Sequence, residues 1–95
     1  MSSDAAALHR DLTIVNKRGL HARASAKFVQ LVTGYDADVR VEKDGVEVGG
    51  TSIMGLMMLA AGVGSSISVT ATGRQAGEIM EALSALVADR FGEEC

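Results

Sequence analysis

The sequence predicts a single α+β domain in which helices cover one face of a β-sheet. Apolar and polar residues alternate in the segments predicted as strands, and apolar residues recur at helical spacing in two longer segments. These segments follow one another in the order βαββαβα. Because the strands, except the less clear first one, have one apolar and one polar face, we expect helices on one side of the sheet and water on the other.

The first segments of the chain are predicted to form an arm, a strand and a helix. Residues 1–10 have no periodicity and are interpreted as a flexible N-terminal arm, whereas residues 11–17 resemble a short strand. Residues 22–33 have apolar side chains on one face and charged or polar ones on the other, which is typical of an amphipathic helix. Gly34 is suited to end this helix.

A hairpin is predicted next. Residues 39–42 alternate between valine and a charged residue, as in a strand with one wet face. The Asp-Gly pair at positions 44–45 favours a tight turn. Residues 46–48 are therefore expected to pair with residues 39–42.

The remaining elements are a short helix, a strand and a long helix. Ser52 or its neighbour Thr51 can cap a short helix over residues 53–60. Residues 66–72 alternate between polar and apolar side chains and predict a strand. Apolar residues between positions 76 and 87 mark one face of a final helix of about four turns.

Composition limits the function classes. The 95 residues are 47% apolar and contain no proline, so we expect one domain over residues 11–91, followed by a tail over residues 92–95. The net charge of −3 and the three aromatic residues argue against nucleic-acid binding. The single cysteine, Cys95, excludes a disulfide framework within the chain and fits a reducing, cytoplasmic compartment. No apolar run is long enough for a membrane span.

His21 is the residue most strongly associated with chemistry. It directly precedes the helix predicted over residues 22–33, and helix N-termini attract anions through unpaired backbone N–H groups. Residues 17–27 contain Lys17, Arg18, Arg23 and Lys27 and no carboxylate. His21 is therefore placed to receive and hold a phosphoryl group, with Arg23 as a permanent cation beside it. A plain capping histidine in a loop is the competing interpretation.

Other chemistries have no matching motif. The spacings typical of metal ligands are absent, and so are a nucleophile elbow and the glycine-rich nucleotide loops. We expect no metal and no cofactor. A phosphoryl donor would therefore be another molecule.

The segment from Thr51 to Leu59 has almost no polar face. A two-turn helix on a one-sided sheet cannot bury all of these side chains, so we expect an exposed apolar docking patch at Ile53, Met54 and Met57, with Lys27 beside it. Phosphorylation of Ser52 would add about −1.5 to −2 charges next to this patch. The competing interpretations are a fully buried helix and a serine that acts only as a cap.

Two motifs resemble the HPr family, the histidine phosphocarriers of the bacterial phosphoenolpyruvate-dependent phosphotransferase system. Residues 19–23, Gly-Leu-His-Ala-Arg, match the active-site motif of the family, and residues 52–55, Ser-Ile-Met-Gly, match its regulatory-serine motif. The resemblance covers about residues 11–91. It implies an open-faced β-sandwich, with a four-stranded antiparallel sheet and three helices on one side.

The resemblance also implies roles for individual residues. His21 would accept phosphate on Nδ1 from phospho-enzyme I and pass it to IIA proteins. Arg23 would pair with the phosphoryl group, and the backbone N–H groups of Ala22 and Arg23 would hold its oxygens. The chain would then be a monomeric covalent carrier that does not turn over alone, and HPr kinase/phosphorylase would be a partner if Ser52 is modified.

One departure concerns the branch of the family. Ala24 stands where many members have proline, and the pattern around it is similar to the nitrogen-related branch or to single-HPr systems. Both a regulatory output and sugar transport are therefore compatible with the sequence. It is also compatible with a regulatory HPr-like binding protein that acts mainly through Ser52, and with an unrelated small α/β binding domain.

Overall fold

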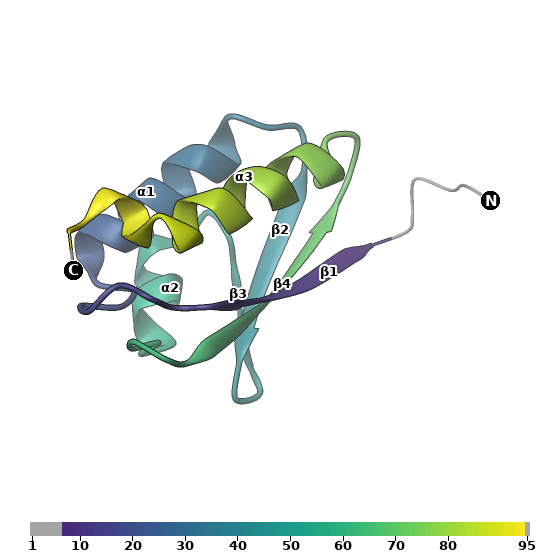
Figure 1. The fold of residues 1–95 in the computed structure, drawn as a ribbon. Coiled ribbons are helices and arrows are strands. Elements are labelled where there is room, and N and C mark those ends of the chain that lie inside the picture. Colours follow the sequence, from purple (N-terminus) through teal and green to yellow (C-terminus); the bar gives the residue numbers. More distant parts are fainter. Residues whose placement is uncertain (1–6, 95) are drawn as a thin grey trace.

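The computed structural model describes residues 7–94 and contains a four-stranded antiparallel sheet covered on one face by three helices (Figure 1). The strands lie in the order β1-β4-β2-β3, so the central strands β4 and β2 have neighbours on both sides. The predicted fold class and element order are confirmed. The elements are β1 Leu8–Thr13, α1 Ala22–Thr33, β2 Asp38–Lys43, β3 Val46–Gly49, α2 Ile53–Met58, β4 Ser66–Thr72, α3 Ala76–Ala88 and a short 3-10 turn, η2 Arg90–Gly92.

The core lies between the sheet and the helices. In β4 the side chains of Ile67, Val69 and Ala71 are fully buried, while the serines and threonines between them are on the other face. This alternation is the expected pattern of an antiparallel strand with one wet face. Phe28 of α1 and Leu83 of α3 are also fully buried and fill the space between the helix layer and the sheet.

The hairpin turn has the backbone geometry that its sequence predicts. Asp44 and Gly45 both have positive φ, 53° and 84°, as in the turns whose twist matches that of paired strands. The carboxylate of Glu42 accepts the N–H of Gly45 at 2.6 Å. The predicted hairpin is confirmed, and its register pairs residues 40–43 with residues 46–49.

The predicted C-terminal end of the N-terminal arm, at residue 10, was wrong. β1 begins at Leu8, and residues 8–10 pair with Ala71, Thr70 and Val69 of β4. Because β1 is an edge strand whose first four side chains are exposed, these residues carry no alternating pattern. The strand also ends at Thr13, earlier than predicted, and a loop leads from there to α1. Residues 1–6 of the predicted arm lie outside the described residues.

The helices agree with the sequence except at two ends. α1 has the predicted bounds and Gly34 is its C-cap. α2 ends at Met58 rather than at residue 60, because Ala60 has a left-handed backbone with φ 53°. After α3 the chain continues into η2, so Gly92 is not part of a tail as predicted. Within the described residues, no helix is both long and apolar enough to span a membrane.

Candidate functional site

The loop between β1 and α1 is held against a second loop near Ala61. The N–H of Leu20 donates to the carbonyl of Ala61 at 3.0 Å, and Gly19 has a φ of 68°. A Cβ on Gly19 would collide with the Ala61 carbonyl oxygen and lie 2.9 Å from the Cα of Gly62. Only glycine accommodates both this backbone angle and this close approach. The contact lies directly before His21, the N-cap of α1.

His21 is the N-cap of α1, as predicted. Its backbone is extended (φ −74°, ψ −177°), and its carbonyl accepts the first intrahelical hydrogen bond, from the N–H of Ser25 at 2.9 Å. The ring nitrogen Nδ1 accepts the N–H of Arg23 at 3.3 Å. Nδ1 therefore faces the N-terminal end of the helix, where backbone N–H groups have no intrahelical acceptor.

The other ring nitrogen faces a carboxylate that the sequence pattern did not predict. His21 Nε2 is hydrogen-bonded to Glu93, and the two side chains are only 17% and 16% exposed. The second carboxylate oxygen of Glu93 accepts the side-chain amide of Asn16 at 3.0 Å. Glu93 falls in the predicted tail, and 72 residues separate it from His21, so no local pattern connects the two.

This environment lowers the pKa of Glu93. The largest cause is the hydrogen bond from His21. Desolvation, the second largest, acts in the opposite direction, and the Asn16 hydrogen bond and the charges of His21 and Arg18 add to the lowering. The carboxylate form is therefore stabilised in the folded protein. Although the sequence places no carboxylate among residues 17–27, the fold brings one to His21.

The chain end reaches His21 through a turn of three residues with positive φ. Arg90, Phe91 and Gly92 have φ values of 58°, 55° and 78°. The ring of Phe91 is fully buried, and Lys27 donates from Nζ to the Phe91 carbonyl at 2.6 Å. Lys27, expected to be a docking residue, thus has its ammonium group engaged in holding this turn.

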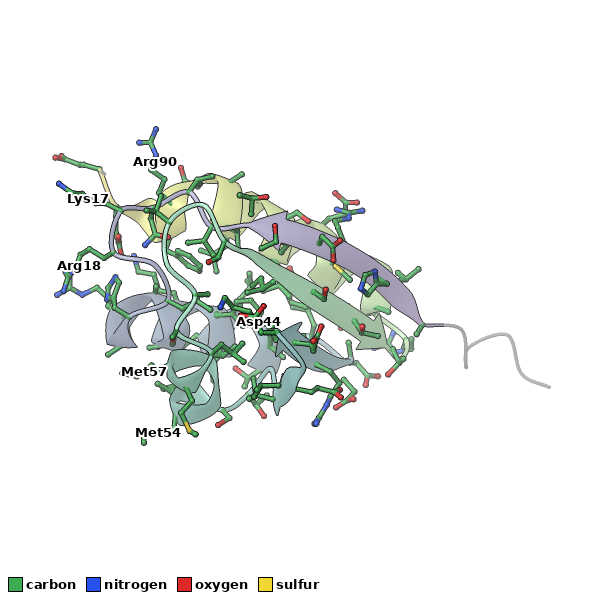
Figure 2. All side chains as sticks on the ribbon, turned by 90° about the horizontal axis from the view of Figure 1, so that it is seen from below. Lys17, Arg18, Asp44, Met54, Met57 and Arg90 are labelled. Carbon is green, nitrogen blue, oxygen red and sulfur yellow. The ribbon has the colours of Figure 1, made fainter. Side chains whose placement is uncertain are left out.

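Two hollows border the site. The larger has a volume of about 500 Å³ and is lined mainly by charged residues: Lys17, Arg18, Arg23, Lys27, Gly92, Glu93 and Glu94. The smaller, of about 310 Å³, is lined by Arg18, Leu20, His21, Met57 and residues 60–62. Figure 2 shows Lys17 and Arg18 at the same end of the molecule as Met54 and Met57. The imidazole of His21 thus lies between a basic surface and an apolar one.

The short helix α2 forms the apolar surface. Met54 and Met58 are 70% and 74% exposed, Ile53 and Met57 are 39% exposed, and Leu56 is the buried residue of the helix. The expectation that several of these side chains face solvent is confirmed. Ser52 is exposed at the N-cap, where its Oγ accepts the N–H of Gly55 at 2.9 Å.

Within residues 7–94, no three His, Cys, Asp or Glu side chains converge in a way that could hold a metal ion. The second histidine, His9, lies on the exposed edge strand β1 and is 3.7 Å from Asp11. His21 is thus the histidine that the fold places at a helix N-terminus.

The fold and the site define a class of small α+β domains in which a histidine begins a helix beside a basic surface. The family model for the HPr component phosphorylation site of the phosphotransferase system (PTS) matches residues 8–89. The chain belongs to the HPr family of phosphocarrier proteins.

Known relatives cover nearly the whole chain. The phosphocarrier protein HPr of Cupriavidus necator is 52% identical over 86 residues, which are 90% of this chain and 97% of the relative. The phosphocarrier protein NPr of Shewanella violacea is 37% identical, again over 90% of this chain and 94% of the relative. A crystal structure of HPr from Thermoanaerobacter tengcongensis superposes with a TM-score of 0.88 at 39% identity, covering 93% of this chain and 99% of that one.

Proposed function

We propose that His21 carries a phosphoryl group on Nδ1, received from phospho-enzyme I and passed to a IIA protein. One observation carries this proposal: Nδ1 faces the N–H of Arg23 at the N-terminus of α1. A nucleophile there attacks from a place where backbone N–H groups and the helix dipole favour negative charge.

The proposed step is a displacement at phosphorus. The lone pair of Nδ1 forms the new N–P bond while the bond from phosphorus to the donor breaks and its electron pair leaves with the donor. The N–H groups of Ala22 and Arg23 would hold the phosphoryl oxygens, and the exposed guanidinium of Arg23 would pair with them. Positioning and charge stabilisation supply the help that such a loose transition state needs.

The apolar surface beside His21 is the proposed docking face for both partners. Met57 lines the smaller hollow together with His21, and Ile53 and Met54 extend the apolar surface along α2. Flexible methionine side chains can adapt to partners of different shape. Donor and acceptor would therefore use one face in turn, with the domain acting as a monomer in the cytoplasm.

Ser52 is the proposed regulatory phosphosite. Its hydroxyl is exposed, and a phosphate there could still accept the N–H of Gly55. The added charge would lie next to Ile53 and Met54 and oppose the docking of an apolar partner surface. An HPr kinase/phosphorylase is the enzyme that we expect to act at this position.

The test is phosphorylation by enzyme I and phosphoenolpyruvate in vitro. The protein should gain one acid-labile, base-stable phosphate, and His21→Ala should gain none. Arg23→Ala should gain the same phosphate more slowly, because it loses a cation beside the phosphoryl group but no core contact. His9→Ala is the matched control and should behave as the unmodified protein. An acid-labile phosphate on His21→Ala would refute the assignment.

A further inference from the structure

We propose that Asn16 and Glu93 are positioning residues that hold His21 with its proton on Nε2 and its lone pair on Nδ1. Neither residue belongs to the motif at residues 19–23. The inference rests on the proposed function of His21, and it explains how the ring is aimed at the helix N-terminus rather than what it carries.

The contacts form a chain from the buried interior to the ring. Asn16 is fully buried, and its amide nitrogen donates to the Gly19 carbonyl at 2.9 Å and to Glu93 Oε1 at 3.0 Å. The other oxygen, Glu93 Oε2, is hydrogen-bonded to His21 Nε2. Both hydrogens of the Asn16 amide are thus used on acceptors, one in the loop that precedes the helix and one in the carboxylate.

The orientation of the Asn16 amide follows from its neighbours. Reversing the amide would point its oxygen at a carbonyl and a carboxylate, which are both acceptors. In the observed orientation the oxygen Oδ1 is buried without a hydrogen-bond partner among the described residues. A buried unpaired oxygen costs free energy, so an apolar residue would be favoured here if the position served packing alone. The asparagine at this position is therefore best explained by the hydrogen bonds that its nitrogen donates to Gly19 and Glu93.

The carboxylate sets the proton position on the imidazole. An ionised carboxylate only accepts hydrogen bonds, so Nε2 must be the nitrogen that carries hydrogen. In the neutral ring the lone pair is then on Nδ1, which faces Arg23 N–H. When the N–P bond forms, Nε2 keeps its proton and the ring gains positive charge, which the adjacent carboxylate stabilises. No proton has to leave during the step.

The backbone just before Glu93 also indicates that the contact between Glu93 and His21 is specifically stabilised. Arg90 and Phe91 adopt left-handed conformations that cost non-glycine residues free energy. Burial of the Phe91 ring and the Lys27 hydrogen bond to its carbonyl hold this turn in place. Strained turns of this kind persist where the surrounding structure requires them, and here the turn places Glu93 against His21.

The experiment compares Glu93→Ala with Glu94→Ala. Both changes remove one carboxylate from the rim of the same basic hollow, but only Glu93 contacts His21. Nitrogen NMR of the imidazole at neutral pH reports the tautomer directly, and enzyme I with phosphoenolpyruvate reports kcat/KM for phosphorylation. For Glu93→Ala we expect a mixture of tautomers and a kcat/KM lower by about tenfold, the size expected for losing one charge-assisted hydrogen bond. Glu94→Ala should keep the single tautomer and the original rate.

Asn16→Ala tests the second member of the pair. It should shift the tautomer and the rate in the same direction as Glu93→Ala, and the double variant should be no slower than Glu93→Ala alone. Thermal unfolding identifies any loss of fold, and Glu93→Ala carries the test if Asn16→Ala does not fold.

An unchanged tautomer in Glu93→Ala, or an equal loss of rate in Glu94→Ala, would overturn the proposal that Asn16 and Glu93 position the ring. If instead the proposed function of His21 were wrong, the measurements would give a different result. Wild-type protein would then take up no phosphate on His21, while the tautomer measurement would still show whether Glu93 positions the ring.

Discussion

At the scale of single residues, Gly19 lies in the loop directly before His21, the N-cap of α1, and is under two constraints. Its left-handed backbone and the approach of Ala61 both exclude a side chain, so two separate physical effects act at one position. At Gly64 only the first of these effects is present, and at Gly62 neither is. This difference allows strain and collision to be separated by substitution.

We predict that Gly19→Ala is much more destabilising than two matched glycine changes. At Gly64, with φ 89° and open space around it, an alanine introduces backbone strain alone, expected to cost about 1 kcal/mol. Gly62 has neither a positive φ nor a close neighbour, so its change should alter the free energy of unfolding by less than about 0.5 kcal/mol. Gly19→Ala adds the collision to the strain and should cost about 3 kcal/mol. Urea unfolding followed by circular dichroism measures all three.

Equal losses for Gly19→Ala and Gly64→Ala would mean that the loop moves away from Ala61 without cost. In that case the contact between the two loops would not fix the start of α1. His21 phosphorylation should fall in Gly19→Ala even under conditions where the variant stays folded, because the N-cap geometry depends on this loop.

At the scale of elements, α2 is the shortest of the three α-helices: it has six residues, and Leu56 is its buried residue. Helices of this length are marginal in isolation. Its N-cap is therefore important, and Ser52 supplies it. The same residue borders the apolar docking surface, so the Ser52 hydroxyl has both a structural role and a proposed regulatory role. Different substitutions of Ser52 are needed to separate the two.

We predict opposite profiles for Ser52→Ala and Ser52→Asp. Alanine removes the cap and should lower the free energy of unfolding by about 1 kcal/mol while leaving phosphoryl transfer unchanged. Aspartate can still cap the helix, so stability should be kept, but its charge beside Ile53 and Met54 should slow transfer to a IIA acceptor several-fold. Transfer rates and thermal unfolding measured on the same samples separate the two effects.

Ala85→Glu is the control for net charge, since Ala85 is exposed on α3, a different helix that packs against β1 and α1. It adds the same charge as Ser52→Asp and should leave transfer unchanged. If both variants slowed transfer equally, the effect would come from the overall charge of the protein, and the docking surface would lose its support.

At the scale of the whole molecule, the site is assembled from three segments that are distant in sequence. The loop before α1 together with the start of α1, the loop at residues 60–62 and the chain end after α3 meet around one imidazole. The places of His21, Arg23 and Ser52 at helix starts could be predicted, because each lies in a short motif at the beginning of a predicted helix. Glu93 could not, since it follows a turn of left-handed residues that no periodic pattern describes, and a charged chain end is normally solvated. β1 began earlier than predicted for a related reason: its first residues are exposed on an edge strand, so pairing with β4 rather than burial holds them.

The chain end also makes the stability of the whole domain depend on pH, and we predict the direction. Because the pKa of Glu93 is lowered by folding, the unfolded chain binds more protons at acidic pH, and stability rises with pH in that range. The contribution of Glu93 is complete at a pH well above its unfolded pKa of about 4.3 and is lost as the pH falls through its lower pKa in the folded protein.

Glu93→Gln lacks this titration, so the wild type should be the more stable of the two at about pH 6, and the difference should shrink steadily towards about pH 3. Urea unfolding at a series of pH values, followed by circular dichroism because the chain has no tryptophan, measures the difference. For Glu94→Gln, the free energy of unfolding plotted against pH should run parallel to that of the wild type. If the difference between wild type and Glu93→Gln stayed constant with pH, the Glu93 carboxylate would not stabilise the contact between the chain end and His21.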